Sequence, residues 1–203
     1  MGVADVARGR VTIGNASRDP LPTDPGGLVF NKIARDGVCV VTNPANPMGN
    51  ISQEIVQAIF SGQIRNWSEV PGSRVNGPIS LQVRNPASGT QDAFQSIFMG
   101  PDLRVTPNST PHDSNGLVQQ GVNSDPNAIG YVSLGIVSGV HSVPYNGVSC
   151  DLRNAKSGQY GGTRNFWMVT RGASSGETAK FIKWAQKSSQ ASKIVATEWV
   201  PLR

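Results

Sequence analysis

The sequence predicts an α/β protein that is rich in loops. Its 203 residues include 15% charged and 37% hydrophobic side chains, with 23 glycines and 14 prolines. That composition is typical of a globular chain and fits neither a coiled coil nor a disordered segment. Apolar residues alternate in some segments, as in strands, and recur three and four positions apart in others, as in helices. At this length the chain forms one large domain or two small lobes.

The first part of the chain is predicted to contain a helix end and a strand. Residues 3–8 fit the end of a helix, and residues 10–14 fit a strand that Asn15–Pro20 breaks. Ser17 and Arg18 lie at the carboxyl end of that strand, where open α/β sheets place ligands. A serine hydroxyl beside an arginine suits an oxyanion, although such pairs are also frequent in ordinary turns.

A second strand, residues 37–41, precedes a proline-containing segment and a helix. Asn43–Pro47 cannot continue a helix, because a proline disfavours the helical conformation of the residue before it, and the segment is predicted to cross between two compact regions. The helix is predicted to begin after Ser52, a common N-cap residue, and to end at Gly62. Trp67 in the following turn is predicted to be a packing anchor.

The most informative part of the chain joins a strand to a helix. Residues 79–83 alternate as a half-buried strand does, and Pro86 requires a turn before any helix begins. Ser88 followed by Gln91 fits a capping box, in which each side chain satisfies a backbone N–H group. Phe94 starts the apolar stripe of the helix behind it.

This strand, loop and helix start also form a candidate oxyanion site. The N–H groups of Ser88, Gly89 and Thr90 are expected at the positive end of the helix dipole, where anions bind. The two hydroxyl groups add donors, and Arg84 at the end of the strand has the fork geometry that contacts two oxygens of a tetrahedral anion. The same pattern fits a capped surface helix beside an ordinary surface arginine.

The middle of the chain is predicted to contain a loop, a short helix and a buried strand. Residues 100–112 read as the loop, and Asp113 or Ser114 is predicted to cap the helix, which Asp125–Pro126 ends. Residues 129–134 fit the buried strand. A second crossing between compact regions is predicted near residues 138–143.

The last part of the chain is predicted to contain a strand and a final helix. Residues 164–170 are apolar and fit the strand, and the helix follows residues 172–176. Its buried face is predicted from its apolar residues, namely Phe181, Ile182, Trp184 and Ala185. The end, Glu198–Leu202, is predicted to pack back onto the first lobe.

Charge and motif content exclude several functions. The formal charge of +5 and the isoelectric point near 9.6 favour anionic partners, but the basic residues form no run and do not alternate with aromatic ones, so we expect no nucleic acid partner. Cys39 and Cys150 are far apart and do not suggest a metal site. A buried thiol is the expected role of Cys39, and a disulfide stays open.

No catalytic constellation is apparent. Ser88 lies outside the GxSxG pattern of hydrolases, and His112 and His141 lie in loop-like segments with no link to a nucleophile. No His/Asp/Glu cluster has the spacing of metal ligands. We therefore expect neither an enzyme nor a cofactor. Residues 1–5 lack the features of a signal peptide, and no apolar run approaches the ~20 residues of a membrane span.

Six segments in this order resemble one known family. The chain is similar to the PstS-like type II solute-binding proteins, the phosphate-binding periplasmic proteins that serve ABC transporters. The segments that carry the resemblance are residues 13–18, residues 35–41 with Asn43–Pro47, residues 59–67, Arg84 with Ser88–Thr90 and Phe94, residues 128–133, and residues 166–170.

The resemblance implies two α/β lobes joined by two crossing strands, which close over an oxyanion. Lobe I is expected at residues 1–45 plus 141–203, and lobe II at residues 46–140. Arg84, Ser88, Gly89 and Thr90 match phosphate contacts of the family, and Ser17 matches a contact position on the opposite lobe. Arg18, beside Ser17, is also expected to bind the phosphate.

The implied function is capture of inorganic phosphate, or a similar tetrahedral oxyanion, for an ABC transporter permease. The expected location is periplasmic or extracellular, with a membrane anchor left open. The alternative is an interaction or sensing module that binds anions weakly or not at all.

Two departures from the family pattern matter. The initial strand and Gly-Ser/Thr loop of family members have no counterpart here, so we expect an incomplete first lobe and a homo-oligomer formed through its exposed sheet edge. In addition, Arg18 occupies a position where the family commonly has an aspartate that accepts the proton of phosphate and repels sulfate. Asp19 or Asp92 is a candidate substitute, and sulfate, molybdate or a phosphorylated metabolite follows phosphate as a ligand.

Overall fold

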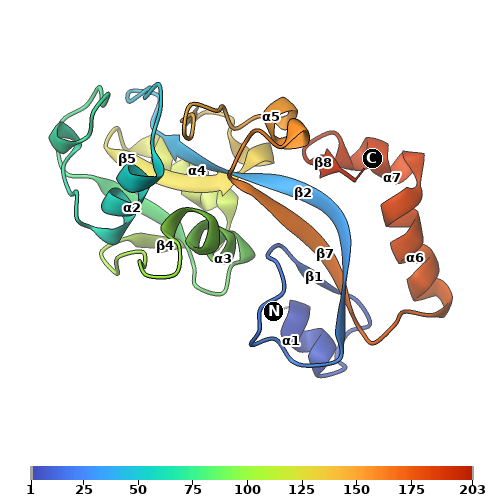
Figure 1. Cartoon of the computed structure of the whole chain (residues 1–203). Helices are drawn as coiled ribbons and strands as arrows, with labels where there is room; N and C mark the ends of the chain where they lie inside the picture. Colours follow the sequence, from blue (N-terminus) through green and yellow to red (C-terminus); the bar gives the residue numbers. More distant parts are fainter. Residues whose placement is uncertain (1, 203) are drawn as a thin grey trace. The chain divides into compact units, whose positions relative to one another are not determined.

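The computed structural model describes residues 2–202 and has a mixed α/β fold (Figure 1). It divides into two compact units. Unit 1 comprises the residues up to Asp36 and from Arg164 onward, and unit 2 comprises Gly37–Thr163. The chain therefore passes between the units twice, once inside a long strand and once at the start of another. None of the described helices combines the length and apolar character that a membrane crossing requires.

Unit 1 is built from both ends of the chain. Its elements are α1 (Gly2–Ala7), β1 (Gly14–Ala16), the first part of β2 (Leu28–Thr42), β7 (Thr163–Arg171), α6 (Gly176–Lys187), α7 (Ser189–Val195) and β8 (Val200–Pro201). Strand β7 lies between β1 and β2 in the sheet, and β8 pairs with β2 at Ala34 and Arg35. The predicted return of the chain end to the first lobe is thus realised as strand pairing within unit 1.

The start of unit 1 corrects one prediction. The helix expected at residues 3–8 is present as α1, but residues 10–13 form no strand, and β1 begins only at Gly14. The cause is the helix end, where Gly9 has a φ of 68° and the Arg10 N–H donates to the Asp5 carbonyl at 2.8 Å. These residues turn the chain instead of extending it.

The face of α6 also differs from the prediction. Ile182 is buried, but Phe181 and Trp184 are 48% and 40% exposed, and their rings stack on each other with centroids 6.0 Å apart. The prediction of one broad apolar face was wrong because α6 packs through a narrower stripe centred on Ile182.

Unit 2 carries a sheet flanked by helices. Its elements after β2 are α2 (Gln53–Ser61), η1 (Trp67–Glu69), β3 (Ser80–Arg84), α3 (Gly89–Phe94), η2 (Gln95–Met99), β4 (Thr110–His112), α4 (Asn115–Ser124), β5 (Ala128–Ser133), η3 (Leu134–Ile136), β6 (His141–Ser142) and α5 (Leu152–Ser157). Strand β3 lies between β4 and β5 and is parallel to both, whereas β5 is antiparallel to β2.

Pairing with β3 explains why β4 was missed. Residues 110–112 carry no apolar alternation, and the sequence predicted a loop there. In the structure Val83 faces Pro111 and Arg84 faces His112 in a parallel register. A neighbouring strand, rather than local propensity, therefore determines the conformation of this segment.

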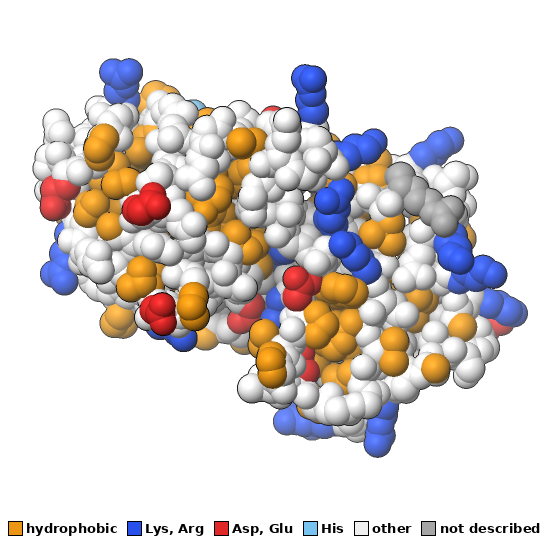
Figure 2. All heavy atoms as spheres, in the orientation of Figure 1, with side chains coloured by type: hydrophobic (Ala, Val, Ile, Leu, Met, Phe, Trp, Pro, Cys, Tyr) orange, Lys and Arg blue, Asp and Glu red, His pale blue; other side chains and the backbone are white. Residues whose placement is uncertain are grey.

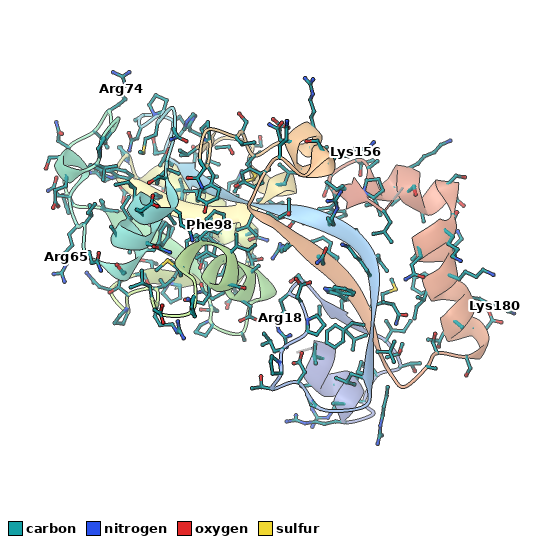
Figure 3. All side chains as sticks on the ribbon, viewed as in Figure 1. Arg18, Arg65, Arg74, Phe98, Lys156 and Lys180 are labelled. Carbon is teal, nitrogen blue, oxygen red and sulfur yellow. A yellow bond between two sulfur atoms is a disulfide. The ribbon has the colours of Figure 1, made fainter. Side chains whose placement is uncertain are left out.

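Aromatic side chains form the core of unit 2. Phe94 stacks on Tyr131 with ring centroids 3.8 Å apart, and Phe60 and Phe98 contact Phe94 at 4.7 and 5.1 Å (Phe98 is labelled in Figure 3). Trp67 is fully buried, and its indole N–H donates to the Asn127 carbonyl at 2.8 Å. Its predicted role as a packing anchor is confirmed.

Several sequence-based boundaries hold in unit 2. Helix α2 begins after Ser52, whose side chain accepts from the Ile55 N–H group, and it ends at Gly62 with a φ of 82°. Helix α4 is capped by Ser114 and ends before Asp125, as expected. Residues 43–47 and 138–143, which the sequence predicted as crossings, both lie inside unit 2. The predicted lobes, residues 1–45 plus 141–203 and residues 46–140, stay a prediction.

A disulfide joins Cys39 to Cys150 within unit 2. The expectation of a free buried thiol at Cys39 was therefore wrong. The reason is tertiary, because the fold brings together two residues that are 111 positions apart. Strand β2 supplies Cys39, and the segment just before α5 supplies its partner.

Candidate functional site

Two helices begin at the same edge of the unit 2 sheet. Strands β3 and β4 are parallel, and Arg84 and His112 face each other at their carboxyl ends. Helix α3 begins five residues after Arg84, and α4 begins three residues after His112. The amide ends of both helices therefore follow the carboxyl ends of parallel strands, where α/β sheets hold ligands.

Ser88 caps α3, as the sequence predicted. Its hydroxyl accepts from the Thr90 N–H at 3.1 Å, and its own N–H donates to the Asn85 carbonyl at 2.9 Å. The capping box with Gln91 was wrong, since the Gln91 side chain accepts a hydrogen bond from the Tyr131 hydroxyl. Gly89 is half-buried between Ser88 and Thr90, and it gives the helix start a surface without a side chain.

Backbone carbonyls fix the guanidinium group of Arg84. Its Nε donates to the His112 carbonyl at 3.2 Å, and one terminal nitrogen donates to the Asp113 carbonyl at 2.8 Å. The other terminal nitrogen lies 3.5 Å from the Thr90 hydroxyl oxygen. The structure thus brings the charge of Arg84 to the start of α3, beside Ser88, Gly89 and Thr90.

Tyr131 ties the two ends of this loop together. Its hydroxyl accepts from the Arg84 backbone N–H at 3.1 Å and donates to the side chain of Gln91. Burial raises the pKa of the Tyr131 phenol well above its usual value, so it stays a neutral donor. Sequence reasoning missed this role. The available signal was a tyrosine in a buried strand, because a buried phenol requires a hydrogen-bond partner.

Ser17 and Arg18 belong to unit 1, in the loop after β1 (Arg18 is labelled in Figure 3). Arg18 forms a bidentate ion pair with Asp24, with nitrogen–oxygen distances of 2.9 and 2.6 Å. The hydrogen bonds from Arg18 lower the pKa of the Asp24 carboxyl group. Arg18 therefore holds its own loop together, and half-buried Ser17 directly precedes it.

The two candidate aspartates lie in different units. Asp19, in unit 1, accepts hydrogen bonds from the Asn165 amide at 2.7 Å and from the Trp167 indole at 3.1 Å. Asp92 lies in the first turn of α3, one turn after Ser88. Of the two, Asp92 shares a helix start with the residues around Arg84.

The histidines have structural partners in unit 2. Both lie in short strands rather than in the loops that the sequence predicted. His112 Nε2 pairs with the Gln82 side-chain oxygen at 2.7 Å, and His141 Nε2 donates to the Met48 carbonyl at 2.7 Å. Across residues 2–202, no group of three or more His, Cys, Asp and Glu side chains has a metal-binding arrangement.

A family model matches most of the chain. The model of the PBP superfamily domain matches residues 1–189. Among curated proteins, the phosphate-binding protein PstS of Bacillus subtilis (strain 168) is 27% identical over 202 residues, which cover 97% of this chain and 66% of that protein. PstS of Borreliella burgdorferi is 25% identical over 148 residues, which cover 68% of this chain and 52% of that protein. The chain thus spans between half and two thirds of the length of these curated relatives.

Solved structures give the same picture. A protein from Clostridium perfringens, described as a phosphate ABC transporter substrate-binding protein with bound phosphate, matches with a TM-score of 0.90 and 31% identity. An ABC-type phosphate transport receptor from Vibrio cholerae matches with a TM-score of 0.82 and 26% identity. Each match covers 100% of this chain and 84% of the other chain. These names describe binding proteins and a transport receptor, in agreement with the expectation of a non-enzymatic chain.

Proposed function

Because this chain belongs to the PBP superfamily, we propose that it captures inorganic phosphate, or a similar tetrahedral oxyanion, for delivery to an ABC transporter. The observation that carries the proposal is the position of Arg84. Carbonyl groups direct its guanidinium toward Thr90, at a helix start whose residues are Ser88, Gly89 and Thr90. An arginine fork with hydroxyl and amide donors matches the shape and charge of a tetrahedral oxyanion.

We assign Arg84, Ser88, Gly89 and Thr90 as the contacts from the second lobe. Arg84 supplies the positive charge, and the three helix-start residues supply uncharged donors. Ser17 is the proposed contact from the first lobe. Arg18 is assigned a positioning role, because its guanidinium already forms two hydrogen bonds to Asp24.

Two lobes that close over the anion, joined by two crossing strands, complete the proposal. A protein of this kind works outside the cytoplasm, in the periplasm or at the cell exterior. The disulfide between Cys39 and Cys150 supports that location, since disulfides persist mainly in oxidising compartments. The transporter permease is the proposed protein partner. Self-association through the sheet edge at β1 stays a prediction, and light scattering over a range of concentrations tests it.

Calorimetric titration of phosphate and of sulfate into the purified chain tests the function. We expect micromolar or tighter phosphate binding in the wild type. Arg84→Ala should weaken phosphate binding by about 10- to 100-fold, because the variant loses charge-assisted hydrogen bonds to the anion. Arg65→Ala is the matched control, because Arg65 is an exposed arginine of unit 2 that donates to the Gly62 carbonyl at 2.9 Å.

Each outcome of the titration has a clear reading. If Arg84→Ala and Arg65→Ala weakened phosphate binding equally, the binding would reflect the general positive charge of the protein and not a site at Arg84. Absence of heat with either anion would favour the alternative, an interaction or sensing module. Preference for sulfate would contradict the assignment of phosphate while leaving the anion site in place. The Asp92→Asn variant tests whether that carboxyl group provides discrimination between the two anions.

A further inference from the structure

The positive charge of the protein is concentrated in unit 1. That unit holds 12 of the 18 lysines and arginines and 6 of the 13 acidic residues. Its formal charge is therefore +6, whereas the remaining residues give unit 2 a charge of −1. Figure 2 shows Lys and Arg side chains gathered over the surface of α6 and α7. Positive charge concentrated in one unit attracts anionic surfaces to that unit.

Helix α6 places its lysines in one row. Lys180, Lys183 and Lys187 are spaced i, i+3 and i+7, which puts their side chains on the same face of the helix. All three are exposed, and Figure 3 shows Lys180 projecting outward from α6. Glu177 is the one acidic residue in α6, and it pairs with Lys180 at 2.6 Å.

An aromatic pair lies beside the lysine row. Phe181 and Trp184 are spaced i and i+3, and their stacked rings are 48% and 40% exposed. Trp184 follows Lys180 by one turn, so the aromatic pair and the lysine row share an edge. Core packing of unit 1 does not need these rings, because Ile182 supplies the buried contact of the helix.

We propose that the exposed face of α6 docks on an anionic lipid surface. Helices that lie in the membrane interface combine tryptophan and phenylalanine with neighbouring lysines, and they have low overall hydrophobicity. The aromatic rings enter the headgroup boundary, and the lysines contact anionic headgroups. The charge of +6 on unit 1 provides the complementarity with such a surface. This proposal does not rest on anion capture by the Arg84 site.

Vesicle cosedimentation tests the proposal with the whole chain. The vesicles contain phosphatidylcholine alone or with about 30% phosphatidylglycerol, at low and at physiological salt. We expect binding to the anionic vesicles, weakening with salt, and no binding to the neutral ones. Entry of Trp184 into the interface also predicts a blue shift of fluorescence, which disappears in Trp184→Phe while binding is kept.

Two pairs of variants separate local docking from general charge. Lys183→Glu with Lys187→Glu is expected to weaken vesicle binding at least about 30-fold, since each lysine near an anionic surface contributes roughly a factor of five. Arg65→Glu with Arg74→Glu changes the net charge equally but lies in unit 2, and it should leave most of the binding. Arg84→Ala should bind vesicles as the wild type does.

The aromatic contribution has its own control. Phe181→Ser with Trp184→Ser is expected to weaken vesicle binding at least about tenfold through loss of buried aromatic area. Leu117→Ser should have little effect, because Leu117 is similarly exposed, at 43%, but belongs to unit 2. Equal binding to neutral and anionic vesicles, or none at low salt, overturns the proposal. So does self-association that the aromatic variant abolishes, because the face then binds a second copy.

Discussion

Removal of one hydroxyl group should separate positioning of the proposed site from stability of the fold. The Tyr131 hydroxyl joins the Arg84 N–H to the Gln91 side chain, and so it links the two ends of the loop that carries Ser88 and Thr90. Tyr131→Phe keeps the ring, which stacks on Phe94 at 3.8 Å. The variant removes one hydrogen bond from the Arg84 N–H group and one from the Gln91 side-chain oxygen.

Tyr160→Phe is the matched control. Tyr160 is also buried in unit 2, and its hydroxyl donates to the Val38 carbonyl at 2.8 Å, a contact outside this loop. Each substitution removes hydrogen bonds made by a buried hydroxyl group, at a cost of about 1–3 kcal/mol. Urea unfolding should therefore show a similar loss of the free energy of unfolding in both variants.

Phosphate affinity should distinguish them. Without the hydroxyl, the Arg84 backbone and α3 lose one of the links that hold them in place, and a loss of about 1.4 kcal/mol corresponds to tenfold weaker binding. We expect this loss in Tyr131→Phe and unchanged affinity in Tyr160→Phe, both measured by calorimetry. Wild-type affinity in Tyr131→Phe, or equal weakening in the two variants, would refute the positioning role.

Three further predictions concern stability. Replacing Cys39 and Cys150 by alanine removes a cross-link between residues 111 positions apart, and chain entropy predicts a loss of up to about 4.7 kcal/mol, measurable by urea unfolding with a reduced wild type for comparison. Arg164 donates to the Asp36 carboxylate at 3.0 and 2.7 Å, and both side chains are buried. Asp36→Asn breaks this buried ion pair and should lower the free energy of unfolding by about 3–5 kcal/mol, and the double variant Asp36→Asn with Arg164→Met should recover part of the loss. Arg18 lowers the pKa of Asp24 in the folded state. The stability that the Arg18–Asp24 ion pair contributes is therefore fully present above the ordinary carboxyl pKa and is lost as the pH falls through the lowered pKa of Asp24. Between neutral pH and about pH 3, the unfolding temperature of Asp24→Asn should accordingly fall less than that of the wild type. An identical fall in both proteins would contradict a stabilising role of the Arg18–Asp24 ion pair.

Local signals in the sequence identified most elements and the residues around Arg84. Ser52, Gly62 and Ser114 act at helix ends through their own backbone neighbours, so their roles are readable from short windows. The same holds for Ser88, whose hydroxyl bonds a group two residues away. The capping box failed because a residue from β5, Tyr131, competes for Gln91. No local window contains that competitor.

Other misses share this cause. Strand β4 exists through its pairing with β3, and the disulfide exists because the fold brings distant cysteines together. The exposure of Phe181 and Trp184 depends on how α6 packs, and periodicity cannot distinguish an apolar residue at the edge of a stripe from one at its centre. The local pattern and the family resemblance both suggested an oxyanion contact for Arg84, whereas the carbonyl groups that hold its side chain became visible only in the structure.

The path of the chain implies an order of folding. Unit 2 is one continuous segment, Gly37–Thr163, and Cys39 and Cys150 lie near its two ends. A segment inserted in this way can fold and close into a covalent ring before the residues from Arg164 onward have been synthesised. Unit 1 cannot, because its sheet needs β7 and β8 from the end of the chain. The half that carries Arg84 is thus expected to mature first, and the half that carries α6 to be completed last.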